Sequence, residues 1–211
     1  MDPSVLDDLV KQFRSDLVSQ PAEDVVRKYV FEGNPYVFRE KPEALKLLKD
    51  HLCANLPLCD KNVVIVGSAQ TGFSLHPDKF PRRFHDGSDI DVLIVDESLF
   101  DAVWSTILEW HYPRRRVGLP AADMRWAKDR SDELYWGWFV PDRIRFEGLS
   151  LPTSLRRLRD ISTQWFNAFQ SLGQYAEFAT RDVSGRLYRS WNHAMLYHKA
   201  GLDLLRDRIT Q

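Results

Sequence analysis

Two apolar stretches near the middle of the chain constrain its fold more than any other feature. The first, VVIVGSAQTGFSL at residues 63–75, is a run of Val and Ile that ends abruptly in a Gly-Ser pair. The second, SDIDVLIVD at residues 88–96, begins with two aspartates and continues as another apolar run. Runs that are apolar on both faces are typical of central strands in a mixed or parallel sheet. We therefore expect neighbouring strands at residues 62–67 and 89–96.

The segments around these two strands have mainly helical spacing of apolar residues. The expected helices cover residues 3–19, 22–31, 41–56 and 99–110, the last with Ser98 as its cap. Residues 133–147 are expected to form one or two further strands around Pro141, and the chain from residue 152 onward is expected to be helical, with one break near Asp182–Gly185. The sequence thus predicts an α+β fold in which helices back a small mixed β-sheet.

The predicted fold divides into three parts along the chain. They are an N-terminal helical segment (1–59), an α/β core (60–150) and a C-terminal helical part (151–211). The 211 residues carry a net charge of only −1, which argues against a uniformly basic nucleic-acid binder. No apolar run reaches the length of a membrane span, and the first residues do not form a signal peptide. We therefore expect a cytoplasmic protein without a membrane partner.

The Gly-Ser pair lies where the first strand is expected to turn into a helix. Gly67 has no side chain, so another group can approach its backbone closely. The amides that follow, with the Ser68 hydroxyl, can hold phosphate oxygens, and Gly72 continues the pattern. A tight strand-to-helix turn without a ligand is the alternative explanation of this stretch.

The aspartates of the second stretch are spaced for metal binding. Asp89 and Asp91 are two residues apart on a predicted strand, so their side chains project from the same face. Adjacent carboxylates repel each other unless a cation lies between them. Oxygen ligands of this kind suit Mg²⁺ or Mn²⁺, which also bind substrate phosphates and water. The alternative is a strand end that carries two solvated carboxylates.

Together, Gly67-Ser68-x-x-x-Gly72 and Ser88-Asp89-Ile90-Asp91 resemble the signature of the polymerase-β-like nucleotidyltransferase superfamily. The resemblance is good over about residues 60–100 and looser up to residue 150, and its nearest members are small bacterial defence or toxin–antitoxin enzymes. It implies that Gly67 and Ser68 bind a triphosphate. It also implies that Asp89 and Asp91 are catalytic residues that hold Mg²⁺ or Mn²⁺, and that a helical part closes over the nucleotide.

The sequence departs from the superfamily pattern in its third carboxylate. Active members normally carry one on a later strand, and this chain has no clear equivalent. The candidates are Asp123, Asp142 and Glu147, with Glu147 slightly favoured because IRFEG places it at a strand end. If all three are structural, the site is expected to bind nucleotide without turning it over.

Several cations and aromatic residues outside these motifs are further candidates for ligand binding. The long loop between the two stretches carries His76, Lys79, Arg82, Arg83 and His85, and the C-terminal part carries Arg186, Arg189 and Lys199. The cations could bind phosphates or a polynucleotide, or form a solvated surface. Trp136 and Trp138 could stack on a base or pack in the core.

The expected function is transfer of a nucleoside monophosphate from a nucleoside triphosphate to an acceptor hydroxyl, with release of pyrophosphate. A nucleotide or a nucleic-acid 3′-hydroxyl fits the basic loop best as the acceptor. A protein hydroxyl, as in a modifying toxin or antitoxin, remains open, as does a small molecule. The alternatives are an inactive nucleotide sensor and a subunit that binds a protein partner or a second copy of the chain.

Overall fold

A four-stranded mixed sheet forms the centre of the protein in the computed structural model, which describes residues 3–111, 130–141 and 153–211. Its strands run in the order β1-β2-β4-β3, with bounds Val63–Val66, Ile90–Val95, Val183–Tyr188 and Trp138–Phe139 respectively. β2 pairs antiparallel with β1 and parallel with β4, and β3 pairs antiparallel with β4. The predicted α+β class and the first two predicted strands are confirmed.

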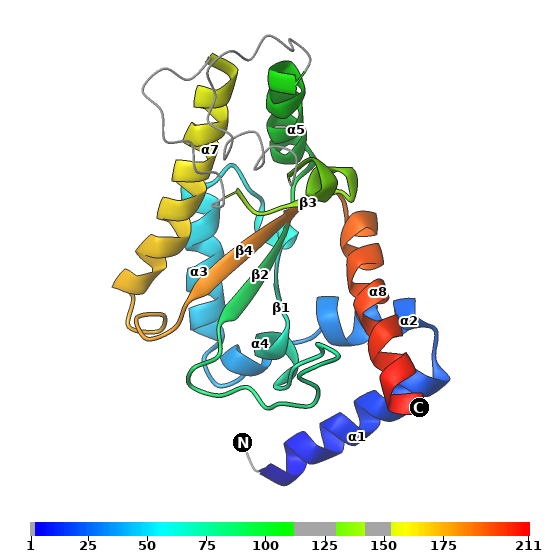
Figure 1. The fold of residues 1–211 in the computed structure, drawn as a ribbon. Helices are drawn as coiled ribbons and strands as arrows, with labels where there is room; N and C mark the ends of the chain where they lie inside the picture. Colours follow the sequence, from blue (N-terminus) through cyan, green and yellow to red (C-terminus); the bar gives the residue numbers. More distant parts are fainter. Residues whose placement is uncertain (1–2, 112–129, 142–152) are drawn as a thin grey trace.

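Helices surround this sheet (Figure 1). The longer α-helices are α1 (Pro3–Ser19), α3 (Pro42–Asn55), α5 (Glu97–His111), α7 (Thr153–Gln170) and α8 (Trp191–Thr210). The short ones are α2 (Ala22–Val26), which continues as a π-helical turn over Arg27–Phe31, and α4 (Ser68–Thr71). Turns of 3-10 helix cover Tyr36–Phe38, Asp60–Asn62 and Ser171–Gln174. Within the described ranges, no helix is long and apolar enough to cross a membrane.

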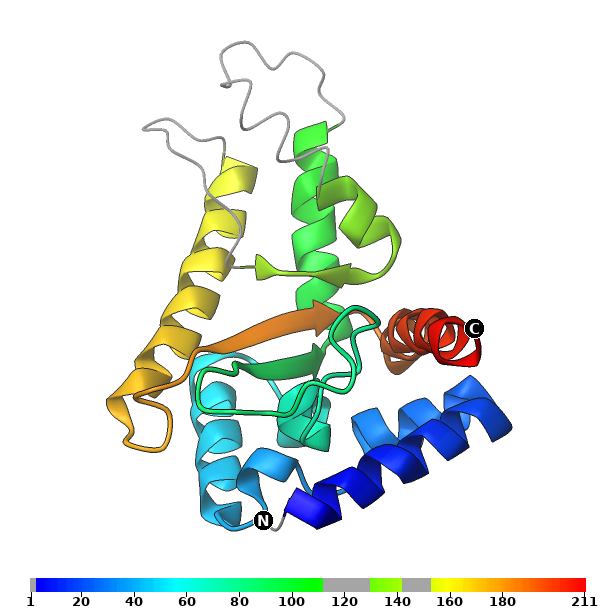
Figure 2. The same cartoon turned by 60° about the horizontal axis from the view of Figure 1, so that its bottom comes forward.

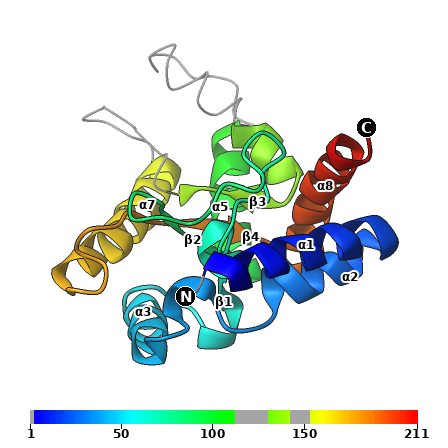
Figure 3. The same ribbon diagram turned by 90° about the horizontal axis from the view of Figure 1, so that it is seen from below.

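The two faces of the sheet pack against different sets of helices (Figure 2). Ile90, Val92 and Ile94 of β2 lie in a buried cluster with side chains of α3, α5 and α7. Leu93 and Val95 alternate with them and join a second cluster with α1, α2 and α8. Figure 3 shows these last three helices gathered on one side of the sheet. Asp91 shares the second face, and this placement positions the site described below.

The structure corrects the prediction that the chain is helical from residue 152 onward. The expected break near Asp182–Gly185 is the start of β4, a strand that lies beside β2 within the sheet. The C-terminal part (151–211) is therefore not only helical, because it contributes an inner strand. β4 carries a glycine and an arginine in its interior, and both residues weaken the apolar pattern that marks a strand.

Two smaller predictions also need correction. Residues 130–135 are helical, so the extended structure expected over 133–147 is limited to β3 within the described residues. The helix predicted at 99–110 begins earlier, at Glu97, and Ser98 is not its cap. The Asp96 carboxylate instead accepts a hydrogen bond from the Leu99 N–H at 2.7 Å, which satisfies a backbone donor in the first turn.

Candidate functional site

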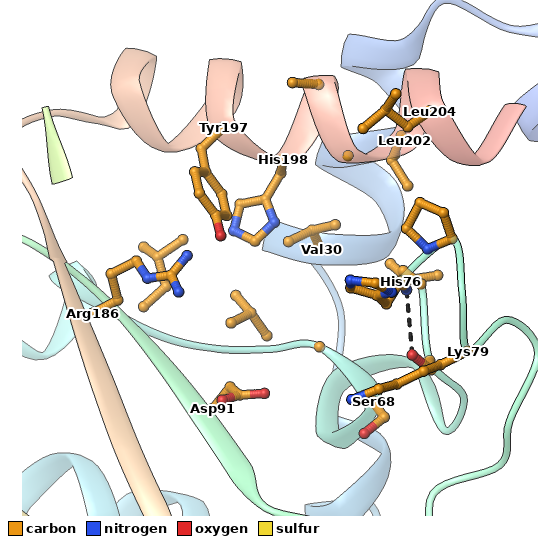
Figure 4. A pocket seen from close by; sticks show the side chains of 18 of the residues that line it. Val30, Ser68, His76, Lys79, Asp91, Arg186, Tyr197, His198, Leu202 and Leu204 are labelled. Atoms are coloured by element: carbon orange, nitrogen blue, oxygen red, sulfur yellow. Dashed lines mark hydrogen bonds between the residues drawn. The ribbon is translucent and has the colours of Figure 1, made fainter. Parts of the chain in front are cut away.

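A pocket of about 1570 Å³ covers the face of the sheet on which Asp91 lies. Its lining includes all four residues predicted to form the site, namely Gly67, Ser68, Asp89 and Asp91. Other lining residues come from β4, from α8 and from the loop after α4. Figure 4 shows Asp91 and Ser68 on one side of the pocket, with residues of α8 opposite them.

The Gly67 turn brings the backbone of β1 against the Asp91 carboxylate. Gly67 has φ +67° and ψ −150°, a conformation that residues with a side chain rarely adopt. A Cβ atom on Gly67 would lie 2.9 Å from Asp91 Oδ2, which is too close for an unstrained contact. Close approach to Gly67 was predicted, and the group that approaches within this chain is the Asp91 side chain. The glycine thus leaves space for the carboxylate.

Asp91 is exposed to solvent and lines the pocket, although nearby protein atoms partly desolvate its carboxylate. Burial raises the pKa of Asp91 above its ordinary value, and the neighbouring charge of Asp89 raises it further. Arg186 and Lys79 are close enough to oppose this rise in the Asp91 pKa without cancelling it. Asp89 and Asp91 therefore concentrate negative charge at this position, which a bound cation would stabilise.

β4 supplies the part of the pocket next to Asp91. Ser184 is the register partner of Asp91, and its hydroxyl donates a hydrogen bond of 3.4 Å to Asp91 Oδ1. Arg186, the register partner of Leu93, also lines the pocket. Sequence reasoning missed Ser184 and placed Arg186 on a helix. Polar residues at every second position of VSGRLY were the available signal for a strand with one face in a site.

The remaining candidate cations divide between the pocket and the surface. Among those predicted from the sequence, His76, Lys79, Arg82 and Arg186 line the pocket. The other four do not line the pocket. Arg83 pairs with Asp7 at 2.5 Å, and Arg189 pairs with Asp101 at 2.8 Å. Lys199 pairs with Glu23 at 3.3 Å, and the His85 ring accepts a hydrogen bond from Gly87 N–H. The first group has the stronger connection to a ligand because its members line the pocket.

The aromatic side chains of Tyr135, Trp136, Trp138 and Tyr197 also line the pocket. Tyr135 and Trp136 are 79% and 67% exposed, and their rings contact each other edge to face at 5.0 Å. Trp138 and Tyr197 form a second edge-to-face contact at 5.7 Å. Exposed flat rings beside a polar site can stack on planar ligands. Both tryptophans proposed from the sequence as stacking residues therefore face the pocket.

His198, on α8, is a pocket residue whose ionisation the structure changes. Burial lowers the pKa of His198 from 6.5 to about 4, with a smaller contribution from the charge of Arg186. Its Nε2 has no hydrogen-bond partner among the described residues. The imidazole is therefore neutral at physiological pH, and in an unfolded chain it would accept a proton at higher pH.

We expect the His198 ring to titrate with a midpoint near pH 4 in the folded protein, because the closed surroundings disfavour the imidazolium. NMR of the Cε1–H signals between about pH 2.5 and pH 8 measures this midpoint, with His198→Gln to assign the peak. The contribution of His198 to folding stability is then complete above pH 6.5 and decreases as the pH falls toward 4. A midpoint at or above 6.5 would contradict the expected burial.

The structure does not describe any of the three candidates for a third carboxylate. Asp123, Asp142 and Glu147 all lie outside the described residues. Within the described ranges, no cluster of three or more His, Cys, Asp or Glu side chains has the arrangement of a metal site. Among the described residues, the hydrogen-bond partner of Asp91 on β4 is Ser184.

Comparisons with known proteins leave the site to be interpreted from its own geometry. No family model, curated protein or solved structure matches this chain.

Proposed function

We propose that this protein is a metal-dependent nucleotidyltransferase. The observation that carries the proposal is the convergence of Asp89, Asp91 and the Gly67-Ser68 turn on one pocket, with Lys79 and Arg186 at its margins. Carboxylates for a metal, a glycine turn and fixed cations are the groups needed to hold a nucleoside triphosphate. These residues are spread over positions 67 to 186 of the sequence, and the fold brings them together.

The carboxylate pair fits Mg²⁺ or Mn²⁺. Asp89 and Asp91 would hold the ion, which would offset the burial and the charge of Asp89 that together raise the pKa of Asp91. Two carboxylates are enough because Mg²⁺ completes its coordination with water and substrate phosphates. When bound, the ion would supply charge stabilisation for the phosphates during transfer.

The residues of the chain would orient the triphosphate for in-line attack. Ser68 offers its hydroxyl at the start of α4, while Lys79 and Arg186 offer positive charge from opposite sides of Asp91 (Figure 4). In the reaction, the acceptor oxygen forms a bond to the α-phosphorus and the bond to the β-phosphate oxygen breaks. Pyrophosphate leaves and the hydroxyl proton passes to solvent. Positioning and charge stabilisation account for most of the rate enhancement.

The size and chemistry of the pocket support a nucleotide or a nucleic-acid 3′-hydroxyl as the acceptor. Small-molecule sites usually occupy about 300–1,000 Å³, and this pocket is larger. The exposed rings of Tyr135 and Trp136 in its lining offer surfaces on which a second base can stack. Such stacking contributes about 1–3 kcal/mol per base without sequence preference.

One observation favours a second candidate, a nucleotide-binding protein that does not turn its ligand over. The superfamily that the sequence resembles carries its third carboxylate on a later strand. In this chain the later strand beside β2 is β4, whose residues on the Asp91 face include Ser184 and Arg186. A sensor of nucleoside triphosphates would need the Gly67-Ser68 turn and the cations, but it would not need a third carboxylate.

Pyrophosphate release separates the two candidates. The purified protein is incubated with Mg²⁺ or Mn²⁺ and each nucleoside triphosphate, alone and mixed, beside an Asp89→Ala/Asp91→Ala variant. Release by the wild type and not by the variant supports transfer, and labelled products then identify the acceptor. Metal-dependent triphosphate binding without release supports the sensor. The absence of any nucleotide binding would overturn both and favour a subunit that binds a partner protein.

A further inference from the structure

Arg186 lies in the pocket against two aromatic rings, Trp138 and Tyr197, which we call the aromatic pair. Its guanidinium carbon lies 4.7 Å from the centre of the Trp138 ring and 4.6 Å from that of the Tyr197 ring. The two rings contact each other edge to face at 5.7 Å, so the guanidinium packs against both rings and not between them. Trp138 comes from β3 and Tyr197 from α8, so two separate elements restrain the arginine.

Arg186 lies on the face of the sheet that carries Asp91. Arg186 is two residues after Ser184 on β4, and Ser184 is the register partner of Asp91, so the three side chains share a face. Arg186 and Asp91 both line the pocket. In the described part of the chain, no ion pair within 4.0 Å joins Arg186 to a carboxylate. The arginine and the aspartate therefore line one pocket without neutralising each other.

The surroundings of Arg186 favour its charged form without supplying a carboxylate partner. Burial disfavours the guanidinium charge, but Tyr188 and Tyr197 together outweigh burial and hold the pKa of Arg186 above its ordinary value. Tyr188 and His198 are both neutral at physiological pH because burial disfavours their charged forms. Among the described residues, a charged arginine that lines a pocket and has no carboxylate within 4.0 Å has the arrangement of an anion-binding site.

We propose that Arg186 is a phosphate-binding residue, which donates a forked pair of hydrogen bonds to a phosphoryl group of the triphosphate in the pocket. This inference rests on the proposed function for the identity of the ligand. The proposal adds the position of the positive charge. Arg186 belongs to β4, the strand beside Asp91, where members of the superfamily that the sequence resembles would carry an acid. The guanidinium supplies there a fixed positive charge, so a single ion on Asp89 and Asp91 completes the site.

The consequence is that part of the affinity for triphosphate does not depend on a divalent metal. In metal-free buffer, inorganic triphosphate is expected to bind the wild type through Arg186 and Lys79, and Mg²⁺ strengthens this binding. Arg186→Gln is expected to weaken binding about tenfold or more, since a charged, forked contact is lost. Arg186→Lys keeps the charge without the fork and is expected to recover only part of the affinity.

The matched control is Arg27→Gln, which removes an exposed arginine of the π-helical turn outside the pocket. Affinity is measured by calorimetry with inorganic triphosphate and with a nucleoside triphosphate, and thermal melting reports whether each variant is folded. The inference predicts a large loss for Arg186→Gln and none for Arg27→Gln. Equal affinities of Arg186→Gln and wild type, or no binding by the wild type, would overturn it.

A measurement on the wild type decides the case if Arg186→Gln fails to fold. The Arg186 Nε–Hε signal in an NMR spectrum is expected to shift on saturation with inorganic triphosphate, and Arg186→Lys assigns the peak. An unmoved signal at saturation would overturn the inference. Arg186-dependent binding without pyrophosphate release would refute only the proposed turnover, whereas release that is indifferent to Arg186→Gln would refute only the role of Arg186.

Discussion

Replacing Asp91 by asparagine is expected to abolish pyrophosphate release and to leave the protein slightly more stable. The loss of activity, about a thousandfold or more, follows from removal of one of the two carboxylates that would hold the metal. The gain in stability follows from relief of an unfavourable charge, since burial and then Asp89 raise the pKa of Asp91. Because the carboxylate is open to solvent on one side, we expect a gain of only about 0.5 kcal/mol.

The pH dependence of this gain provides an internal check. The folded-state pKa of Asp91 is raised, so its ionisation opposes folding at neutral pH, and this penalty disappears as the pH falls through that pKa. The difference in unfolding free energy between Asp91→Asn and wild type should therefore shrink on acidification. Urea denaturation between pH 4 and pH 7 measures it, beside pyrophosphate release at neutral pH.

The matched control for this substitution is Glu177→Gln, which removes an exposed carboxylate outside the pocket. It is expected to change neither activity nor stability appreciably. Retained activity in Asp91→Asn would refute the assignment of Asp91 as a metal ligand. A marked loss of stability in the same variant would instead show that the carboxylate stabilises the fold.

Replacing Gly185 by valine is expected to destabilise the fold severely, because β4 has no space for a side chain at this position. A Cβ atom on Gly185 would lie 2.3 Å from Phe169 Cζ and 2.8 Å from Trp165 Cζ2. Both aromatic residues belong to α7 and are buried in the cluster beneath the sheet. Overpacking of this kind costs about 3 kcal/mol or more when the neighbours cannot move away, and the contact here is with large rings.

Gly173→Ala is the matched control, since a Cβ atom on Gly173 would meet no heavy atom within 4 Å. Chemical denaturation of both variants and wild type gives the difference in unfolding free energy, and we expect a large loss for Gly185→Val only. Wild-type stability in Gly185→Val would contradict the packing of β4 against α7. It would also remove the structural basis for placing Ser184 and Arg186 beside Asp91.

The elements that could be predicted from the sequence are those whose signals lie within a few neighbouring residues. β1 and β2 are short runs of Val, Ile and Leu, and the Gly67 turn between β1 and α4 carries a glycine where a positive φ requires one. Asp89 and Asp91 share a face because strand geometry alternates side chains with a period of two. The face that carries Asp91 was therefore predictable before any tertiary contact was known.

β4 could not be predicted with the same method because its strand character depends on partners far away in the sequence. Val183–Tyr188 contains a glycine and an arginine, and parallel pairing with β2 joins residues that are more than ninety positions apart. Gly185 is explained only by the rings of Phe169 and Trp165, which occupy the space of a side chain. The sequence pattern therefore predicts a helix at Arg186, although it also makes Arg186 a candidate for ligand binding.

The sequence by itself determined the α+β class, the two core strands, the glycine at the end of the first and the shared face of the two aspartates, because these depend on local periodicity and local backbone conformation. Only the tertiary structure decided which residues lie beside Asp91. Ser184 and Arg186 reach it through parallel pairing of β4 with β2, and Trp138 and Tyr197 reach Arg186 from two further elements. Such contacts between distant segments leave no periodic signal in the sequence, since they arise only when the core has packed.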